Sequence, residues 1–164
     1  MKKYEFTGET KRVELWNRTA TLHRIKATVE FGFVKVGELG GWIEKEENLS
    51  HEGKAWVCGD AKVCGDAEVC GDAKVWGNAK VCGDAEVFLA SHVLVMGSVG
   101  SRNDFTTFFR DKDNEITVKC GCFLGKIDKF LEKVTQTHGN NKYALVYRAA
   151  VEVAKLQIEL TERK

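Results

Sequence analysis

The chain has 164 residues, of which 30% are charged, and its formal net charge is +1. This balance excludes a strongly basic nucleic-acid binder, so nucleic acid is not an expected partner. No apolar run approaches the length of about 18 residues that a membrane span needs. The N-terminal sequence MKKYEFTGETKRVELW also lacks the apolar core of a signal peptide. We therefore expect a cytoplasmic protein without a membrane partner.

Residues 1–42 predict an N-terminal β cap. Residues 24–29 and 33–36 are its candidate strands, and the glycines that follow supply turns. We expect this segment to cover the open end of the structure that comes next, because such an end exposes unpaired backbone groups and apolar side chains.

A six-residue repeat occupies the middle of the chain. Valine recurs at every sixth position, with alanine, serine or glycine two residues before it. The valines are Val57, Val63, Val69, Val75, Val81, Val87, Val93 and Val99. A helix rotates by about 100° per residue and would scatter these valines, whereas a strand alternates with period two and places them all on one face. Gly-Asp or Gly-Asn pairs between the strands, such as Gly59-Asp60, tolerate the left-handed backbone of tight corners.

Three strands and three corners would close one triangular coil, so that residues 18 apart stack at roughly 4.8 Å. This spacing resembles that of hexapeptide-repeat proteins, which implies a left-handed parallel β-helix. The stretch GGWIEKEENLS and the V-x-G-[DN]-A repeats look more specifically like hexapeptide-repeat proteins of bacteria and their phages. We assign residues 43–100 to a short β-helix of about three coils, with a two-residue bulge at 50–53.

Residues 101–164 predict a C-terminal module with a β-hairpin and two helices. Residues 105–120 contain two strands around the turn sequence DKDN. Apolar residues then recur at helical spacing until Gly139, a typical helix stop, and a second helix is expected over residues 142–160. The predicted fold is therefore mainly β with a C-terminal α part.

One outward face of the repeat is predicted to be apolar. It collects Trp56, Trp76, His92 and Leu94. Large exposed apolar groups usually mark an interface. We expect the C-terminal helices or another subunit to cover this face, and a homo-oligomer, either dimer or trimer, is an expected assembly.

The six cysteines predict neither a metal site nor a cofactor. Cys58, Cys64 and Cys70 fall on three faces of one coil, so they cannot converge on a zinc ion, which needs four ligands around one centre. Cys64 and Cys82 should be stacked neighbours within disulfide reach. Without an export signal, we expect free thiols.

A polar junction follows the repeat and is the first candidate for ligand or partner binding. Its residues are Ser101, Arg102, Asn103, Asp104, Thr106, Thr107 and Arg110. Arg102 and Arg110 are suited to hold a phosphate or carboxylate bidentately. The alternative interpretation is a polar segment that only terminates the repeat.

The sequence favours a non-catalytic β-helical binding or scaffold protein of phage or prophage origin. The expected partner is a host protein, such as a defence component, or a small anionic ligand. The alternative is a hexapeptide-repeat acyltransferase that uses acyl-CoA, in which His92 or His51 would be the general base.

Overall fold

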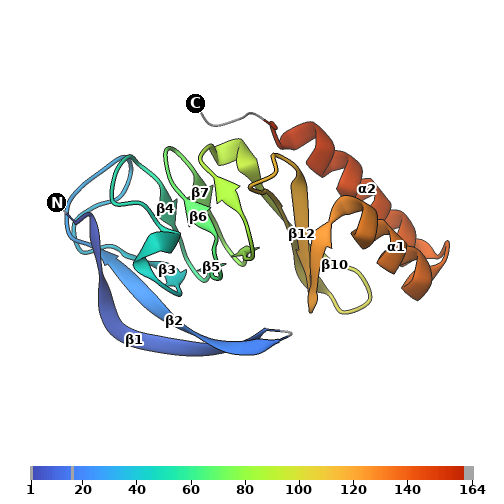
Figure 1. Ribbon diagram of the computed structural model, residues 1–164, viewed down its shortest axis with the longest axis horizontal. Helices are drawn as coiled ribbons and strands as arrows, with labels where there is room; N and C mark the ends of the chain where they lie inside the picture. The colour runs from blue at the N-terminus through green and yellow to red at the C-terminus, as the bar shows by residue number, and fades with distance from the viewer. Residues whose placement is uncertain (1, 16, 161–164) are drawn as a thin grey trace.

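The computed structural model describes residues 2–15 and 17–160 of the chain. Its parts follow one another along the longest axis of the molecule (Figure 1). An N-terminal hairpin and the six-residue repeat lie at one end, a four-stranded sheet comes next, and two helices lie at the other end. The expectation of a mainly β protein with a C-terminal α part is confirmed.

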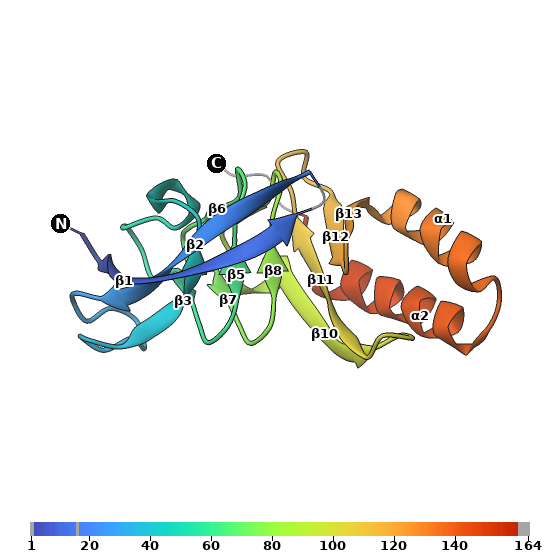
Figure 2. The same cartoon turned by 90° about the horizontal axis from the view of Figure 1, so that it is seen from below.

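Two long strands, β1 (Tyr4–Leu15) and β2 (Arg18–Ala27), form an antiparallel hairpin, and β2 also pairs with β3 (Leu39–Ile43). The hairpin extends along the repeat toward the C-terminal sheet (Figures 1 and 2). The strand expected at 24–29 overlaps the end of β2, whereas residues 33–36 form no strand. Sequence patterns miss β1 because most of its side chains are exposed, so it lacks an alternating apolar pattern.

The N-terminal residues close one end of the repeat. The buried Lys3 Nζ donates to the carbonyl of Ala55 at 2.8 Å, and the Tyr4 hydroxyl donates to the carbonyl of Leu49 at 2.7 Å. These side chains satisfy backbone acceptors that would otherwise be buried without a partner. Most of the hairpin lies elsewhere, along one flank of the repeat.

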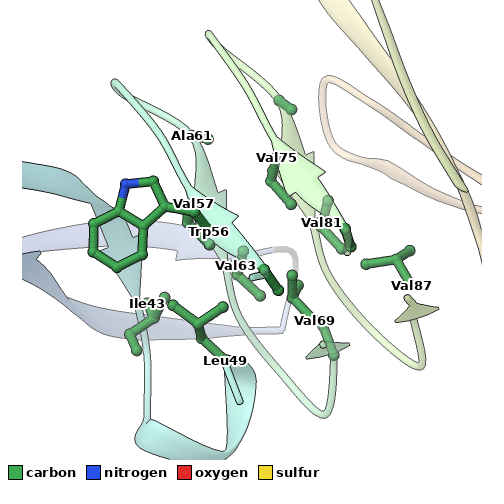
Figure 3. Close-up of a cluster of buried hydrophobic side chains, with 14 of the residues drawn as sticks. Ile43, Leu49, Trp56, Val57, Ala61, Val63, Val69, Val75, Val81 and Val87 are labelled. Atoms are coloured by element: carbon green, nitrogen blue, oxygen red, sulfur yellow. The ribbon is translucent and has the colours of Figure 1, made fainter. Parts of the chain in front are cut away.

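The repeat forms six strands of two residues each. They are β4 (Trp56–Val57), β5 (Lys62–Val63), β6 (Glu68–Val69), β7 (Lys74–Val75), β8 (Lys80–Val81) and β9 (Glu86–Val87). β4 pairs with β7, β5 with β8 and β6 with β9, each in parallel and with a register of 18 residues, as in Val57 opposite Val75. The valines of these strands are at most 1% exposed and point toward one another (Figure 3). The predicted register and inward valines are confirmed.

The predicted left-handed parallel β-helix of about three coils is nevertheless wrong as a description of the fold. The strands belong to separate sheets: β4–β7 and β6–β9 stay two-stranded, while β5 and β8 join a mixed sheet of order β1-β2-β3-β5-β8. Val93 and Val99 continue the six-residue spacing but lie in an antiparallel strand. The next corner position, residues 89–90, is Leu-Ala instead of Gly-Asp or Gly-Asn, so the chain leaves the repeat after Val87 and strands from outside complete the sheets.

The C-terminal sheet is antiparallel and has four strands instead of the expected two. They are β10 (Val93–Val99), β11 (Asp104–Arg110), β12 (Ile116–Cys120) and β13 (Phe123–Lys126). The predicted hairpin is its central pair, β11 and β12. The sequence pattern does not distinguish β10, because its valines fit the repeat, and it gives no signal for β13, because that strand is short and contains Gly125.

Both predicted helices are present, as α1 (Ile127–His138) and α2 (Lys142–Gln157). Gly139 ends α1 with a φ of 62°, as the sequence predicts. In the part of the chain that the structure describes, no helix combines the length and the apolar character needed to cross a membrane.

The C-terminal sheet separates two apolar cores. Phe109 on β11 joins the valine core of the repeat, whereas the adjacent Phe108 faces the helices and packs edge-on against Phe130 at 6.3 Å between ring centroids. Thr107 lies on the repeat side, where its Oγ1 accepts a hydrogen bond from the backbone N–H of Lys80 at 3.0 Å. The sheet therefore closes the second end of the repeat and holds β11 beside β8.

Gly41→Ala should destabilise the protein by about 3 kcal/mol or more, because overpacking against a fixed backbone cannot relax easily. An added Cβ at Gly41 would lie 2.6 Å from the carbonyl oxygen of Ala61 and 2.8 Å from Val57 Cγ1. Gly77→Ala is the control, since its Cβ would meet nothing within 4 Å and only its φ of +57° opposes alanine, at about 1–2 kcal/mol. Urea denaturation of both variants measures the difference; equal losses would contradict the packing argument.

Candidate functional site

The residues predicted for the apolar face are dispersed in the structure. Trp56 is fully buried and packs against Phe31 of the N-terminal segment at 5.3 Å between ring centroids. Leu94 is half-buried and packs against the core beneath the helices. Of these four residues, Trp76 is the one that is largely exposed, at 49%. Its ring stacks on that of Phe33. The face is thus covered partly by the N-terminal segment and partly by the C-terminal module.

His92, the first candidate base, is fully buried and holds a turn. It ends the short 3-10 helix η2 (Ala90–His92), and its Nδ1 accepts the backbone N–H groups of Phe88 and Leu89 at 3.1 and 3.2 Å. Asn48 has the same place in η1 (Glu46–Asn48), where its Oδ1 accepts two backbone N–H groups in the same way. His92 is therefore the counterpart of a structural asparagine.

His51, the second candidate base, is also engaged in the structure. Its Nδ1 accepts the backbone N–H of Lys3 at 3.1 Å, and its ring stacks on Tyr4 with 4.1 Å between centroids. Its other nitrogen lies 3.7 Å from Glu46 Oε1. The two histidines thus belong to two separate turns.

The residues of the polar junction divide between different environments. Ser101, Arg102 and Asp104 line a hollow of about 130 Å³ beside the helices. Asn103 is exposed in the turn between β10 and β11. Thr106 is buried and donates toward Cys120 Sγ at 3.4 Å.

The last two junction residues face the repeat. Thr107 binds the backbone of β8 as described above, and Arg110 Nη1 donates to the carbonyl of Glu86 at 2.9 Å. Arg110 is 3% exposed, so it cannot meet Arg102 across one ligand. The structure does not bring the seven predicted residues together as one site.

A groove that the sequence did not predict lies between the tip of the β1–β2 hairpin and the C-terminal sheet. It consists of two hollows of about 280 and 100 Å³ that share Leu15, Cys64, Cys82 and Lys119 in their linings. Arg18 at the hairpin tip forms a bidentate ion pair with Glu44 at 2.6 and 3.0 Å, which ties the hairpin to the repeat.

Three lysines line the smaller hollow: Lys62, Lys80 and Lys119. Lys62 and Lys80 are directly opposite each other in the β5–β8 pair, and Lys119 comes from β12. Among residues 2–15 and 17–160, none of these three ammonium groups forms an ion pair with a carboxylate. Lys62 and Lys119 donate hydrogen bonds to backbone carbonyls, those of Asp60 and Gly121.

The carboxylates at the rim do not neutralise this cluster. Asp66 pairs with Lys45 at 3.2 Å and Asp84 pairs with Lys112 at 3.3 Å. Glu14 lines the lysine hollow as well, and it accepts a hydrogen bond from Thr19. One carboxylate therefore faces three ammonium groups, and the hollow has an excess of positive charge.

The surroundings of Lys62 disfavour its charged form. Burial lowers its pKa, and the nearby ammonium groups of Lys11 and Lys80 lower it further, while Asp60 opposes the shift. An anion bound between Lys62 and Lys80 would relieve the repulsion, because each ammonium group would gain a charge-assisted hydrogen bond.

Part of this groove was visible in the sequence. Lys62 and Lys80 are 18 residues apart, so the repeat places them on one face together with Cys64 and Cys82. Nothing in the sequence pattern indicates that the hairpin covers this face or that Lys119 approaches from the C-terminal sheet.

Comparison with known proteins adds no identification: no family model matches the chain, and no curated protein matches it. A role for the groove must therefore be inferred from its geometry.

His92→Asn should keep the turn and remove a pH-dependent part of the stability. Burial, followed by the charge of Arg110, lowers the pKa of His92 to about 4 from 6.5. The unfolded chain therefore binds a proton that the folded protein does not bind between these values, and stability falls by about 3 kcal/mol as the pH drops through this window. Urea denaturation above pH 6.5 and near pH 4 should show a smaller acid loss for His92→Asn than for the parent protein. An equal loss in both proteins would contradict the assignment, and His92→Ala, which lacks the acceptor, should be less stable than His92→Asn at either pH.

Proposed function

We propose that the protein is a non-enzymatic binding protein whose groove takes a small phosphorylated ligand, such as a nucleotide. The observation that carries this proposal is the cluster of Lys62, Lys80 and Lys119, which lie in one hollow without carboxylate partners in the described part of the chain. Lysine is a common phosphate-binding residue because its ammonium group acts as a point charge with three donors.

The groove offers different chemistry to the two parts of such a ligand. The lysine hollow, of about 100 Å³, suits a phosphate group rather than a whole nucleotide. Leu15 and Leu124 line the adjoining hollow of about 280 Å³, which supplies an apolar wall for the uncharged part of the ligand. Binding sites commonly combine apolar walls with a few convergent polar groups in this manner.

The acyltransferase alternative has less support. A general base must be within hydrogen-bond reach of the acceptor hydroxyl. The Nδ1 atoms of His92 and His51 accept backbone N–H groups, and His92 is fully buried. We therefore favour binding over acyl transfer.

The origin and setting of the protein stay predictions from the sequence. These are a phage or prophage source, a cytoplasmic location and the sequestering of a host component.

Self-association also stays a prediction, and the exposed Trp76 beside Phe33 is the surface at which to test it. The mass of the Trp76→Asp variant in solution should be lower than that of the parent if this surface joins subunits; an unchanged mass would contradict that role.

Lys80→Gln combined with Lys119→Gln should weaken binding of adenosine diphosphate more than tenfold, because each lost charge-assisted hydrogen bond contributes about 1.5–3 kcal/mol. Isothermal titration calorimetry measures the affinity, and thermal denaturation with and without the nucleotide measures the stabilisation that binding confers. Affinity in the parent protein should decrease as salt increases.

The matched control replaces two surface lysines of the helices, Lys129→Gln and Lys155→Gln, which form ion pairs far from the groove. It removes the same net charge and should leave affinity unchanged. Inorganic pyrophosphate is the second probe. Equal weakening in both double variants, or no binding of either probe to the parent protein, would overturn the proposal.

A further inference from the structure

Two cysteines form the floor of the groove. Cys64 follows β5 and Cys82 follows β8, and the parallel register that places Val63 opposite Val81 brings these cysteines side by side. Their Sγ atoms are 3.2 Å apart, with Cys64 donating to Cys82. At the same register, Cys58 and Cys70 are 18 residues from Trp76 and Phe88, so no other thiols of the repeat are stacked in this way.

The pair is buried but adjoins open space. Cys64 is 2% exposed and Cys82 is 5% exposed, and both line the two hollows of the groove. Ala20 and Leu22 of the hairpin pack against them from one side. A small molecule in the groove can therefore reach the sulfur atoms, whereas a bulky thiol reagent cannot do so without displacing the hairpin.

The surroundings favour a thiolate on Cys82. The hydrogen bond from Cys64 lowers the pKa of Cys82, against burial, which raises it, and the ammonium groups of Lys119 and Lys80 lower it further. The pKa of Cys64 is raised, because its thiol is the donor of that hydrogen bond. Cys82 is therefore suited to be the nucleophile, whereas Cys64 keeps its proton.

We propose that Cys64 and Cys82 are a redox-active dithiol that hydrogen peroxide converts to a disulfide. The Cys82 thiolate attacks one peroxide oxygen, the O–O bond breaks, and the released hydroxide takes a proton to become water. Cys64 then attacks the sulfenic sulfur of Cys82, the S–S bond forms, and the departing hydroxide takes the proton of Cys64. In total, two thiols lose two electrons and two protons, and one peroxide becomes two molecules of water.

Oxidation would change the protein in two ways. The disulfide links the residue after β5 to the residue after β8 and closes a loop that contains β6, β7 and β8, so it restricts the unfolded chain and raises the melting temperature. It also removes the thiolate charge beside Lys80 and Lys119. Both consequences arise at the same in-register pair of sulfur atoms.

The test begins with the parent protein and a small excess of hydrogen peroxide. The intact mass should fall by two hydrogens, peptide mapping should give a Cys64–Cys82 link, and the melting temperature should rise and return on reduction. Cys64→Ser should instead accumulate a sulfenic acid on Cys82, which intact-mass measurement detects as one added oxygen atom. A folded parent protein that forms no such link, or one whose Cys120 or Cys122 is oxidised first, would overturn the proposal.

Matched variants separate the pair from the other thiols and from the lysines. Replacing Cys58, Cys70, Cys120 and Cys122 by serine should leave formation of the link intact. Lys119→Gln should slow it by about threefold or more, because less thiolate is present, whereas Lys129→Gln should not change the rate. An unchanged rate in Lys119→Gln would contradict the assignment of Cys82 as the nucleophile.

This proposal does not depend on the phosphorylated ligand. The link is measured in protein without any phosphate compound, so failure of oxidation and failure of nucleotide binding are separate results.

Discussion

The inward packing of one valine in every six residues is the interaction on which the rest of the molecule depends. Each strand of the repeat has only two residues, so it can make few backbone hydrogen bonds, and its stability must come from burial. A buried valine contributes about 1.5 kcal/mol or more, and six of them form a continuous column between the two ends (Figure 3). The small alanines two residues earlier leave room for this column at the corners.

This column has two open ends and three flanks, and the rest of the chain closes both ends and covers the flanks in part. Lys3 and Tyr4 bind carbonyl groups at one end, and Phe109 of the C-terminal sheet closes the other. The β1–β2 hairpin covers one flank. It rests on Cys64 and Cys82, and the ion pair between Arg18 and Glu44 holds its tip. The groove exists because the hairpin and the C-terminal sheet approach the same flank from opposite ends without meeting completely.

The same stacking that stabilises the column creates the unusual chemistry of the groove. In the β5–β8 pair the register of 18 residues places Lys62 opposite Lys80, and it brings the thiols of Cys64 and Cys82 into contact. Like charges opposite each other on neighbouring strands cost stability. The chain nevertheless adds a third cation, Lys119, from a different sheet. A bound anion, as we propose, and a thiolate on Cys82 would be two ways to compensate this charge, in adjacent parts of one groove.

The sequence by itself determined the glycine corners of the repeat, the inward valines and the 18-residue register. It also determined the central C-terminal hairpin and both helices. These features follow from neighbouring residues: glycine permits a positive φ, alternation selects a face, and Gly139 ends a helix. Only the tertiary structure decided how the sheets divide, where β1 lies, and that His92 holds its turn in the way that Asn48 holds another. The tertiary structure also determined the groove. Lys119 and the β1–β2 hairpin line it through contacts between segments far apart in the sequence, and no local sequence pattern predicts such contacts.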